Sequence, residues 1–221
     1  MKSDLRLTCP QLSMDLAAIR QIIRTALRHE RDSGALQGKL EQNLAELNEK
    51  LMLPEQAPVA ALLGFIERYV KSVPSSLRLV QAISEKQGFF EYAAPFLRMA
   101  EDYFLQPPED LPDDGGLEAL LDEAFLAHRL LEEVNDHHIR HLRRPLLPVD
   151  MTEANIIVHH LLGDEFATRL EQLVQFTAAQ LLDREHVWDQ VRTAHEAPYK
   201  ALVSSERIDA GQDRIKLRLA S

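Results

Sequence analysis

The chain has 221 residues, a formal net charge of −10 and 45% apolar residues, with only 6% aromatic residues and 8 glycines. This length and apolar content suit a single domain, with or without an appendage, and a composition dominated by Leu, Ala, Glu, Gln and Arg favours an all-α fold. The acidic charge argues against nucleic acid as a partner, because phosphate recognition needs a basic surface.

The sequence lacks features that direct a chain into or across a membrane. No basic segment followed by an apolar one begins at Met1, and no apolar run is long enough to cross a bilayer. The single cysteine, Cys9, cannot form an internal disulfide, and no CxxC pair is present to bind zinc through thiolates. We therefore expect a cytoplasmic protein that makes no membrane contact.

Residues 1–53 are predicted to form an N-terminal helical, coiled-coil-like segment. Apolar residues recur at helical spacing between Leu12 and Leu27, and Gly34 then interrupts the pattern, so this part is either one kinked helix or two helices. After Gly34, leucines follow at steps of three or four residues, as in a short coiled-coil seam. These leucines either pack back on the rest of the chain or join two copies into a homo-oligomer: Leu36, Leu40, Leu44, Leu47 and Leu51.

Residues 58–196 are predicted to form the core of the fold, a helical bundle that brings the total to about six or seven helices. Its first helix is expected to end at Pro74, because proline disrupts a helix interior. The next helix is expected over about 77–104, where Gly88 or Pro95 either bends it or splits it, and we favour a kink over two separate helices.

Two long helices are predicted at the centre of this bundle, one from Leu117 to about Leu142 and one over about 151–190. A loop rich in Pro and Gly precedes the first helix, and Pro145 and Pro148 lie in the connection between the two. Antiparallel packing across this connection would place the end of the first helix beside the start of the second.

Residues 197–221 are predicted to form a C-terminal extended or β-ribbon tail. Basic and apolar side chains alternate over 214–219, which is typical of a half-buried strand. Its expected partner is either 201–204 or 5–7. A two-stranded ribbon is marginal by itself, so an unpaired tail is the alternative.

Several polar side chains of the helix over 117–142 fall on its apolar face. His128 and Asn135 lie within the stripe, and Glu132 and His138 lie at its edges. Burying a polar side chain costs about several kcal/mol unless the side chain is hydrogen-bonded or paired. We therefore expect these polar residues to have partners inside the core. The remaining polar residues of this region fall on the opposite face and are expected to be solvated: Glu133, His137 and His141.

The helix predicted over 151–190 carries a second polar group on its apolar face. His159 lies in the middle of the stripe, and Gly163 follows one turn later. A glycine in a helix costs about 1 kcal/mol relative to alanine unless close helix approach or space for a ligand compensates. We expect antiparallel packing to bring Asn155 and His159 towards Asn135, His138 and Glu132.

Three interpretations of this polar seam remain open. As a metal site it would bind iron, manganese or zinc, because imidazoles and carboxylates in a bundle core are ligands for these ions. As a hydrogen-bond network it would fix helix register, as buried polar residues do in coiled coils. As a small-molecule pocket it would be lined by the aromatic residues Phe89, Phe90 and Phe166 and by Asn135, Asn155, His159 and Gly163. The candidate metal ligands are His128, Glu132, His138 and His159, with Glu67 or Glu91 as a further carboxylate.

The sequence contains no phosphate-binding glycine loop, no GxSxG and no HExxH, so we assign no catalytic residue and no enzymatic activity. The leading hypothesis is a bundle that acts through protein contacts or self-association. The alternatives are a metal-dependent bundle, either a di-iron or related oxidative enzyme or a metal binder, and a small-molecule-binding bundle.

Overall fold

The computed structural model describes residues 14–87, 90–107, 116–143, 145, 150–182 and 215–218. These residues form seven helices and one two-stranded ribbon, which confirms the all-α prediction. Within them, no helix contains an 18-residue stretch apolar enough to span a bilayer. The elements are α1 (Leu16–Ser33), α2 (Ala35–Lys50), β1 (Leu51–Met52), α3 (Pro58–Gln87), α4 (Phe90–Leu105), α5 (Leu117–Leu142), α6 (Thr152–Leu162), α7 (Asp164–Leu182) and β2 (Lys216–Leu217).

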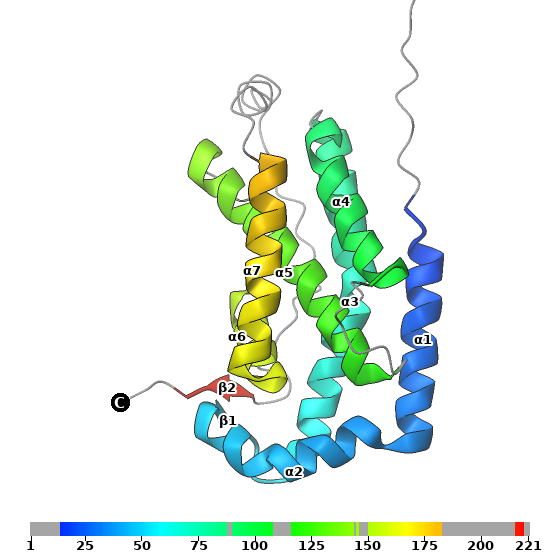
Figure 1. The fold of residues 1–221 in the computed structure, drawn as a ribbon, viewed down its shortest axis with the longest axis vertical. Coiled ribbons are helices and arrows are strands. Elements are labelled where there is room, and N and C mark those ends of the chain that lie inside the picture. The colour runs from blue at the N-terminus through cyan, green and yellow to red at the C-terminus, as the bar shows by residue number, and fades with distance from the viewer. Residues whose placement is uncertain are drawn as a thin grey trace, which may run out of the picture.

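Helix α5 runs through the middle of the bundle and contacts α1, α3, α4, α6 and α7 (Figure 1). A helix covered on several sides must be apolar around most of its circumference, and residues 124–128 of α5 are all completely buried. The single stripe predicted for this helix was therefore too narrow. Ile139, an apolar residue of the same helix, is 40% exposed because it lies near the end of α5, where fewer helices cover it.

The first two helices are separate elements that meet at Gly34. Gly34 has the left-handed φ of 63°, and its amide donates to the carbonyl oxygen of Glu30 at 2.8 Å, which ends α1. The buried Glu30 carboxylate then accepts hydrogen bonds from the amides of Leu36 and Gln37 at 3.0 and 2.9 Å. Together with the hydrogen bond from the amide of Ala35 to Oγ of Ser33 at 3.3 Å, these bonds satisfy donors in the first turn of α2.

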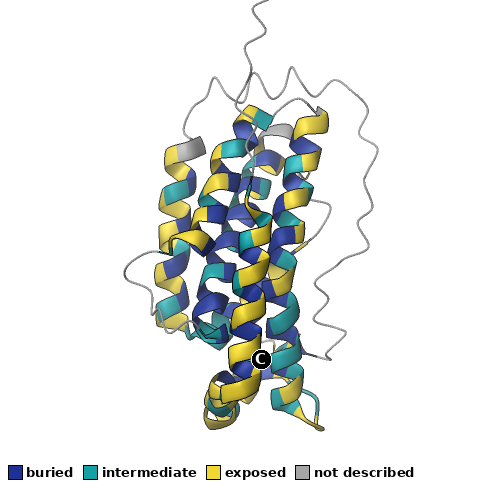
Figure 2. Cartoon of the chain, turned by 90° about the vertical axis from the view of Figure 1, so that its right-hand side faces the viewer, coloured by how far each residue is buried: buried dark blue, intermediate teal, exposed yellow. Residues whose placement is uncertain are grey.

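The leucine seam of α2 packs back on the bundle. Helix α2 lies across one end of the molecule and contacts α3 and α6 (Figure 1). Four of the five seam leucines are at most 6% exposed, and Leu44 is partly buried against the same core. The buried residues of α1, α2, the remaining helices and Ile215 form one continuous cluster, and Figure 2 shows the buried faces turned inwards.

Helix α3 continues through Pro74, contrary to our prediction that it would end there. Proline removes one amide donor but leaves the rest of the helix able to form, provided that packing compensates for the loss. Pro74 is itself buried, and its neighbours Val73 and Leu77 are completely buried. Tertiary contacts therefore outweigh the local preference at this position.

The kinked helix predicted over 77–104 is instead two helices. Helix α3 extends to Gln87, α4 begins at Phe90, and the two pack against one another, so the chain reverses between them. Pro95 lies inside α4 and does not end it. The prediction was wrong because local sequence signals do not distinguish a bend from a reversal.

The short ribbon joins the segment after α2 to the C-terminal strand. Strands β1 and β2 are antiparallel, with Leu51 opposite Leu217 and Met52 opposite Lys216. The amide of Arg218 also donates to the carbonyl oxygen of Lys50 at 2.9 Å. The C-terminal strand is therefore confirmed, but its partner is β1. The two partners that we predicted, 201–204 and 5–7, lie outside the described residues.

Candidate functional site

The helix predicted over 151–190 breaks at Gly163, so the single-helix prediction is wrong for the described residues up to 182. Gly163 has φ +85° and ψ 138°, a conformation that L side chains rarely adopt. Apart from atoms of Gly163 and of its two chain neighbours, no atom lies within 4 Å of the position that a Cβ would occupy there. The glycine therefore serves the turn between α6 and α7 and not a close helix approach.

The break changes which residues face the core. Helix α6 buries Ala154, Asn155, Ile157 and Val158, whereas Ile156 is 39% exposed. Our prediction assumed one continuous helix, in which residues of α6 and α7 would share one apolar face. The turn at Gly163 changes the direction of the chain, so the buried face of α6 cannot be deduced from that of α7. His159 is consequently half-buried at the edge of the core.

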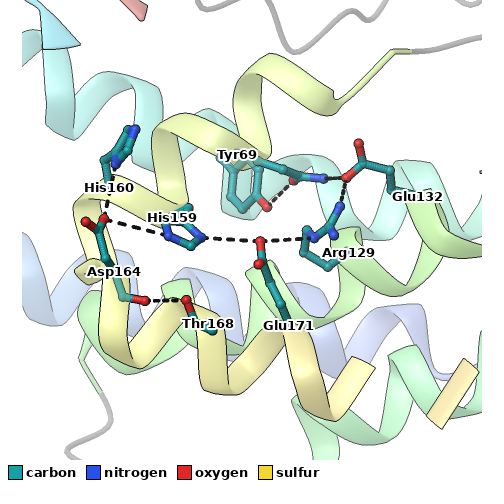
Figure 3. A network of polar contacts seen from close by, with 9 residues as sticks. Tyr69, Arg129, Glu132, His159, His160, Asp164, Thr168 and Glu171 are labelled. Atoms are coloured by element: carbon teal, nitrogen blue, oxygen red, sulfur yellow. Dashed lines mark hydrogen bonds and ion pairs between the residues drawn. The ribbon is translucent and has the colours of Figure 1, made fainter. Parts of the chain in front are cut away.

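Glu132 is the centre of a buried polar network that links α5 to α6 (Figure 3). One carboxylate oxygen accepts hydrogen bonds from Arg129 and, at 2.5 Å, from Nδ2 of Asn155. The other accepts from Oγ1 of Thr152 at 2.9 Å. Glu132 is only 9% exposed, so these donors replace most of the water that a carboxylate would otherwise bind.

Tyr69 extends the network into α3. Its hydroxyl donates to Oδ1 of Asn155 at 2.6 Å, so the two ends of the Asn155 amide join the tyrosine to Glu132. Complete burial raises the pKa of Tyr69 well above its ordinary value, and the negative charge of Glu132 adds to this effect. Tyr69 is therefore held as a neutral hydrogen-bond donor.

On the other side of Glu132, the network continues towards solvent through Arg129 and Glu171. Arg129 Nε lies 3.5 Å from Glu171, and the same carboxylate oxygen of Glu171 lies 3.3 Å from His159 Nδ1. Burial lowers the pKa of Arg129, but the carboxylates of Glu132, Glu171 and Glu133 raise it above its ordinary value overall. The guanidinium is thus held between α5 and α7 as a permanent charge.

The outer end of the network is Asp164, the first residue of α7. Its carboxylate lies 3.7 Å from His159 and 3.3 Å from His160, and its second oxygen lies 3.1 Å from Nζ of Lys50 on α2 (Figure 3 shows the histidine contacts). The Lys50 hydrogen bond, followed by that of His160, lowers the pKa of Asp164. Contacts of Asp164 therefore tie the α6–α7 junction to α2.

His128 belongs to a separate contact between α5 and α3. Its Nε2 lies 2.9 Å from Oγ of Ser72 and 3.1 Å from the carbonyl oxygen of Tyr69. Because a carbonyl oxygen only accepts, this geometry favours the tautomer with hydrogen on Nε2. Nδ1 is buried without a hydrogen-bond partner. Burial lowers the pKa of His128 to about 4, so the imidazole is neutral near neutral pH.

The predicted metal ligands do not converge in the described part of the chain. Glu67 pairs with Lys71 at 2.6 Å, Glu91 is exposed on α4, and His138 is buried near the end of α5. Among the described residues, no group of three or more His, Cys, Asp or Glu side chains is arranged to hold a metal ion. The geometry therefore offers no support for the iron, manganese or zinc hypothesis.

The structure joins some residues of the predicted seam and separates others. Glu132 contacts Asn155 directly, and His159 reaches them through Glu171 and Arg129. Asn135 is half-buried, and His128 is held by α3. Tyr69, Arg129, Thr152 and Glu171 were not among the predicted site residues. Tyr69 carried no signal of a polar role, since it shares the apolar face of α3 with Ile66 and Val73.

A cavity of about 320 Å³ lies where α2 crosses the start of α5 and the α6–α7 junction. Of the residues that we expected to line a pocket, Gly163 and Phe166 do so. Phe90, Asn135, Asn155 and His159 are not among the lining residues, and Phe89 lies outside the described residues. The cavity is lined by Leu36, Lys39, Leu40, Asn43, Glu46, Leu47, Ile66, Glu118, Ala119, Leu121, Asp122, His160, Leu161, Leu162, Gly163 and Phe166.

Fold and site together define an all-α helical bundle with a polar network between α3, α5, α6 and α7 and a cavity beneath α2. No protein-family model, curated protein or solved structure matches the chain. Functional inference therefore depends on the chemistry of these two features.

Proposed function

We propose that this protein is a small-molecule-binding helical bundle and that its ligand occupies the cavity beneath α2. The observation that carries the proposal is the cavity itself, whose volume of about 320 Å³ is within the usual range for ligand pockets. Its inner wall includes the buried side chains Leu36, Leu40 and Leu121, and exposed polar residues such as Asn43 lie at its edge. Ligand sites combine apolar walls with polar groups that orient the ligand, and the lining of this cavity contains both kinds of side chain.

The polar network supports this proposal by holding one wall of the cavity in place. Gly163 lines the cavity, and the adjacent Asp164 is bound to Lys50 of α2 and close to His160. The same junction is connected inwards through His159 and Glu171. A binding site whose walls are fixed before the ligand arrives loses less conformational entropy on binding.

The hypothesis of self-association through the α2 seam gains less support from the structure. The seam leucines are already packed inside a single chain, so they could contact a second copy only if α2 left the bundle. Association through another surface stays a prediction. The cavity, in contrast, is available without any rearrangement of the described residues.

Blocking the mouth of the cavity tests the proposed function. Asn43 is an exposed α2 residue at the cavity, so Asn43→Trp should obstruct entry without disturbing the core. Asn48→Trp, at an exposed α2 position that does not line the cavity, is the matched control. Binding of cationic, neutral and anionic aromatic fragments would be measured by ligand-observed NMR and calorimetry.

We expect at least one fragment class to bind saturably to the unmodified protein and to Asn48→Trp, and to lose at least about tenfold in affinity with Asn43→Trp. Absence of saturable binding by every fragment class would contradict the proposal. Equal binding by the two tryptophan variants would also contradict it, since the ligand would then occupy another place.

A further inference from the structure

Resting on the proposed function, we infer that the ligand is a neutral apolar molecule with one hydrogen-bond donor, such as a phenol, and that Nε2 of His160 accepts this hydrogen bond. His160 lies in the last turn of α6 and lines the cavity beneath α2. Its Nδ1 lies 3.3 Å from a carboxylate oxygen of Asp164 and forms a hydrogen bond with it. The second ring nitrogen is the one that can meet a ligand.

Asp164 determines which nitrogen of His160 carries the hydrogen. The hydrogen bond from Lys50, followed by that of His160, lowers the pKa of Asp164, so its carboxylate is ionised near neutral pH. An ionised carboxylate only accepts hydrogen bonds, so the hydrogen of a neutral imidazole beside it lies on Nδ1. Nε2 is then an acceptor, and Asp164 fixes the orientation of the ring.

Nε2 of His160 is available for this contact. Figure 3 shows it on the side of the ring away from Asp164. Among the described residues, no group forms a hydrogen bond with this nitrogen. The side chain is 25% exposed, so the acceptor is neither sealed in the core nor fully surrounded by water. A ligand donor would therefore meet an acceptor that the fold itself does not use.

The charged residues of the cavity do not select a charged ligand, because the protein already pairs them. Lys39 forms an ion pair with Glu118. Glu46 lies 3.6 Å from Lys50, and Asp122 also has an interaction within the protein. A neutral ligand leaves these interactions intact.

The apolar part of the cavity determines the rest of the ligand. Leu40, Leu47 and Ile66 are each at most 5% exposed and line the wall formed by α2 and α3. These side chains can cover hydrocarbon or an aromatic ring but offer no hydrogen bond to a second polar group. One donor on an apolar body matches both walls, whereas a polyhydroxylated molecule such as a sugar does not.

Three probes of similar shape test the need for a donor: 4-ethylphenol, 4-ethylanisole and 4-ethyltoluene. The first donates and accepts a hydrogen bond, the second only accepts, and the third does neither. Binding to the full chain would be measured by calorimetry and ligand-observed NMR at about pH 8, where an ordinary imidazole and a phenol are both uncharged. We expect 4-ethylphenol to bind about tenfold more tightly than either analogue, because only the phenol satisfies Nε2.

Nitrogen NMR of the histidine side chains tests the same contact in the unmodified protein. We expect the hydrogen of His160 on Nδ1 in the free protein and a shift of its Nε2 resonance when 4-ethylphenol is added. His29, which is exposed on α1 and does not line the cavity, should show no such shift. Hydrogen on Nε2 of His160 in the free protein would overturn the inference.

Substitution of His160 locates the effect. His160→Phe keeps a ring but removes the acceptor, so it should abolish the preference for 4-ethylphenol and change the affinity for 4-ethyltoluene by less than about twofold. His29→Phe is the matched control and should retain the preference. If circular dichroism shows that His160→Phe does not fold, His160→Leu replaces it with the same expected result.

The outcomes separate this inference from the function on which it rests. If 4-ethylphenol and 4-ethyltoluene bind equally and Asn43→Trp weakens both, the binding function stands and the role of His160 is wrong. A preference for 4-ethylphenol that persists in His160→Phe also overturns that role, since another acceptor would then explain it. Binding by charged fragments alone would show that the ligand is not neutral. If no fragment of any kind binds, the proposed function itself fails.

Discussion

Glu132 shows how a charged side chain can lie in the interior of a helical bundle. Its carboxylate receives donors from Arg129, Thr152 and Asn155, and Asn155 in turn receives the hydroxyl of Tyr69. A buried ion pair is costly to desolvate, and it becomes tolerable when further hydrogen bonds satisfy both partners. Each member of this group therefore depends on the others.

Removing the Glu132 carboxylate should be strongly destabilising. Glu132→Leu leaves the Arg129 guanidinium without its nearest counter-charge and Asn155 Nδ2 without an acceptor, so we expect the free energy of unfolding to fall by about 3–5 kcal/mol. Glu132→Gln keeps one acceptor oxygen and should cost less. Urea denaturation measures both, with Glu133→Gln at the neighbouring, more exposed position as control, and a loss as small as that of the control would contradict the network.

His128 predicts a specific dependence of stability on pH. The unfolded chain takes up a proton below about pH 6.5, whereas burial delays protonation of the folded imidazole to about pH 4. The unfolded state thus binds more protons in this window, and stability falls by up to about 3 kcal/mol as the pH is lowered through it. Below about pH 4, His128 is protonated in the folded and the unfolded protein, so its contribution to the free energy of unfolding falls no further.

His128→Met, a residue of similar volume that does not titrate, isolates this contribution. Urea unfolding of the protein and of the variant would be compared from about pH 7 to about pH 4. The difference between the two free energies of unfolding should move in favour of the variant as the pH falls. A difference that is constant across the window would show that His128 is not buried in its neutral form.

At the scale of elements, two glycines of similar surroundings have opposite roles. Apart from the adjacent backbone, no atom lies within 4 Å of a Cβ position at Gly163 or at Gly38, so steric space does not distinguish the two glycines. Gly38 lies inside α2, where glycine only adds conformational entropy to the unfolded chain. Gly163 has φ +85° and separates α6 from α7, which sets the orientation of the residues on each side.

The two positions form a matched pair of substitutions. Gly163→Ala should lower the free energy of unfolding by about 1–2 kcal/mol, because alanine is strained at positive φ. Gly38→Ala should raise it by about 0.5–1 kcal/mol, because alanine is the better helix former. Thermal and urea unfolding measure both changes, and a stabilising Gly163→Ala would mean that α6 and α7 form one continuous helix.

At the scale of the whole molecule, the C-terminal strand closes the fold against the segment after α2. Ile215 is completely buried in the common core. Strand β2 pairs with β1, although the helices α3 to α7 lie between the two strands in the chain. A two-residue ribbon contributes few hydrogen bonds by itself. Its attachment to the core therefore depends mainly on the burial of apolar side chains such as Ile215 and Leu51.

Ile215→Ala should consequently lower the free energy of unfolding by about 2–5 kcal/mol, the usual cost of truncating a buried isoleucine. Lys216→Ala, at the adjacent exposed position, should change it by less than about 0.5 kcal/mol. Urea unfolding followed by circular dichroism gives both values. If the two substitutions have equal effects, the strand does not contribute to the core.

Within a single helix, the sequence predicted which polar residues of the site are buried, because the angular position of each residue around the helix follows from its spacing along the chain. The helical spacing of residues over 117–142 correctly identified His128, Glu132 and His138 as buried. Antiparallel packing of this helix on the next one predicted that Asn155 would approach Glu132. The residues that complete the network were missed because their partners are distant in the chain. Tyr69 and Asn155, for example, are 86 residues apart.

By itself, the sequence determined the all-α class and the bounds of α5, and it indicated a C-terminal strand with an unpaired tail as the alternative, because periodicity and helix-ending residues act over a few neighbouring positions. Only the tertiary structure decided that α3 passes through Pro74, that Gly163 divides a helix, that β2 pairs with β1 and that α2 covers a cavity. In each of these cases, contacts between remote segments outweigh or select among local preferences, and such contacts have no signature in the order of nearby residues.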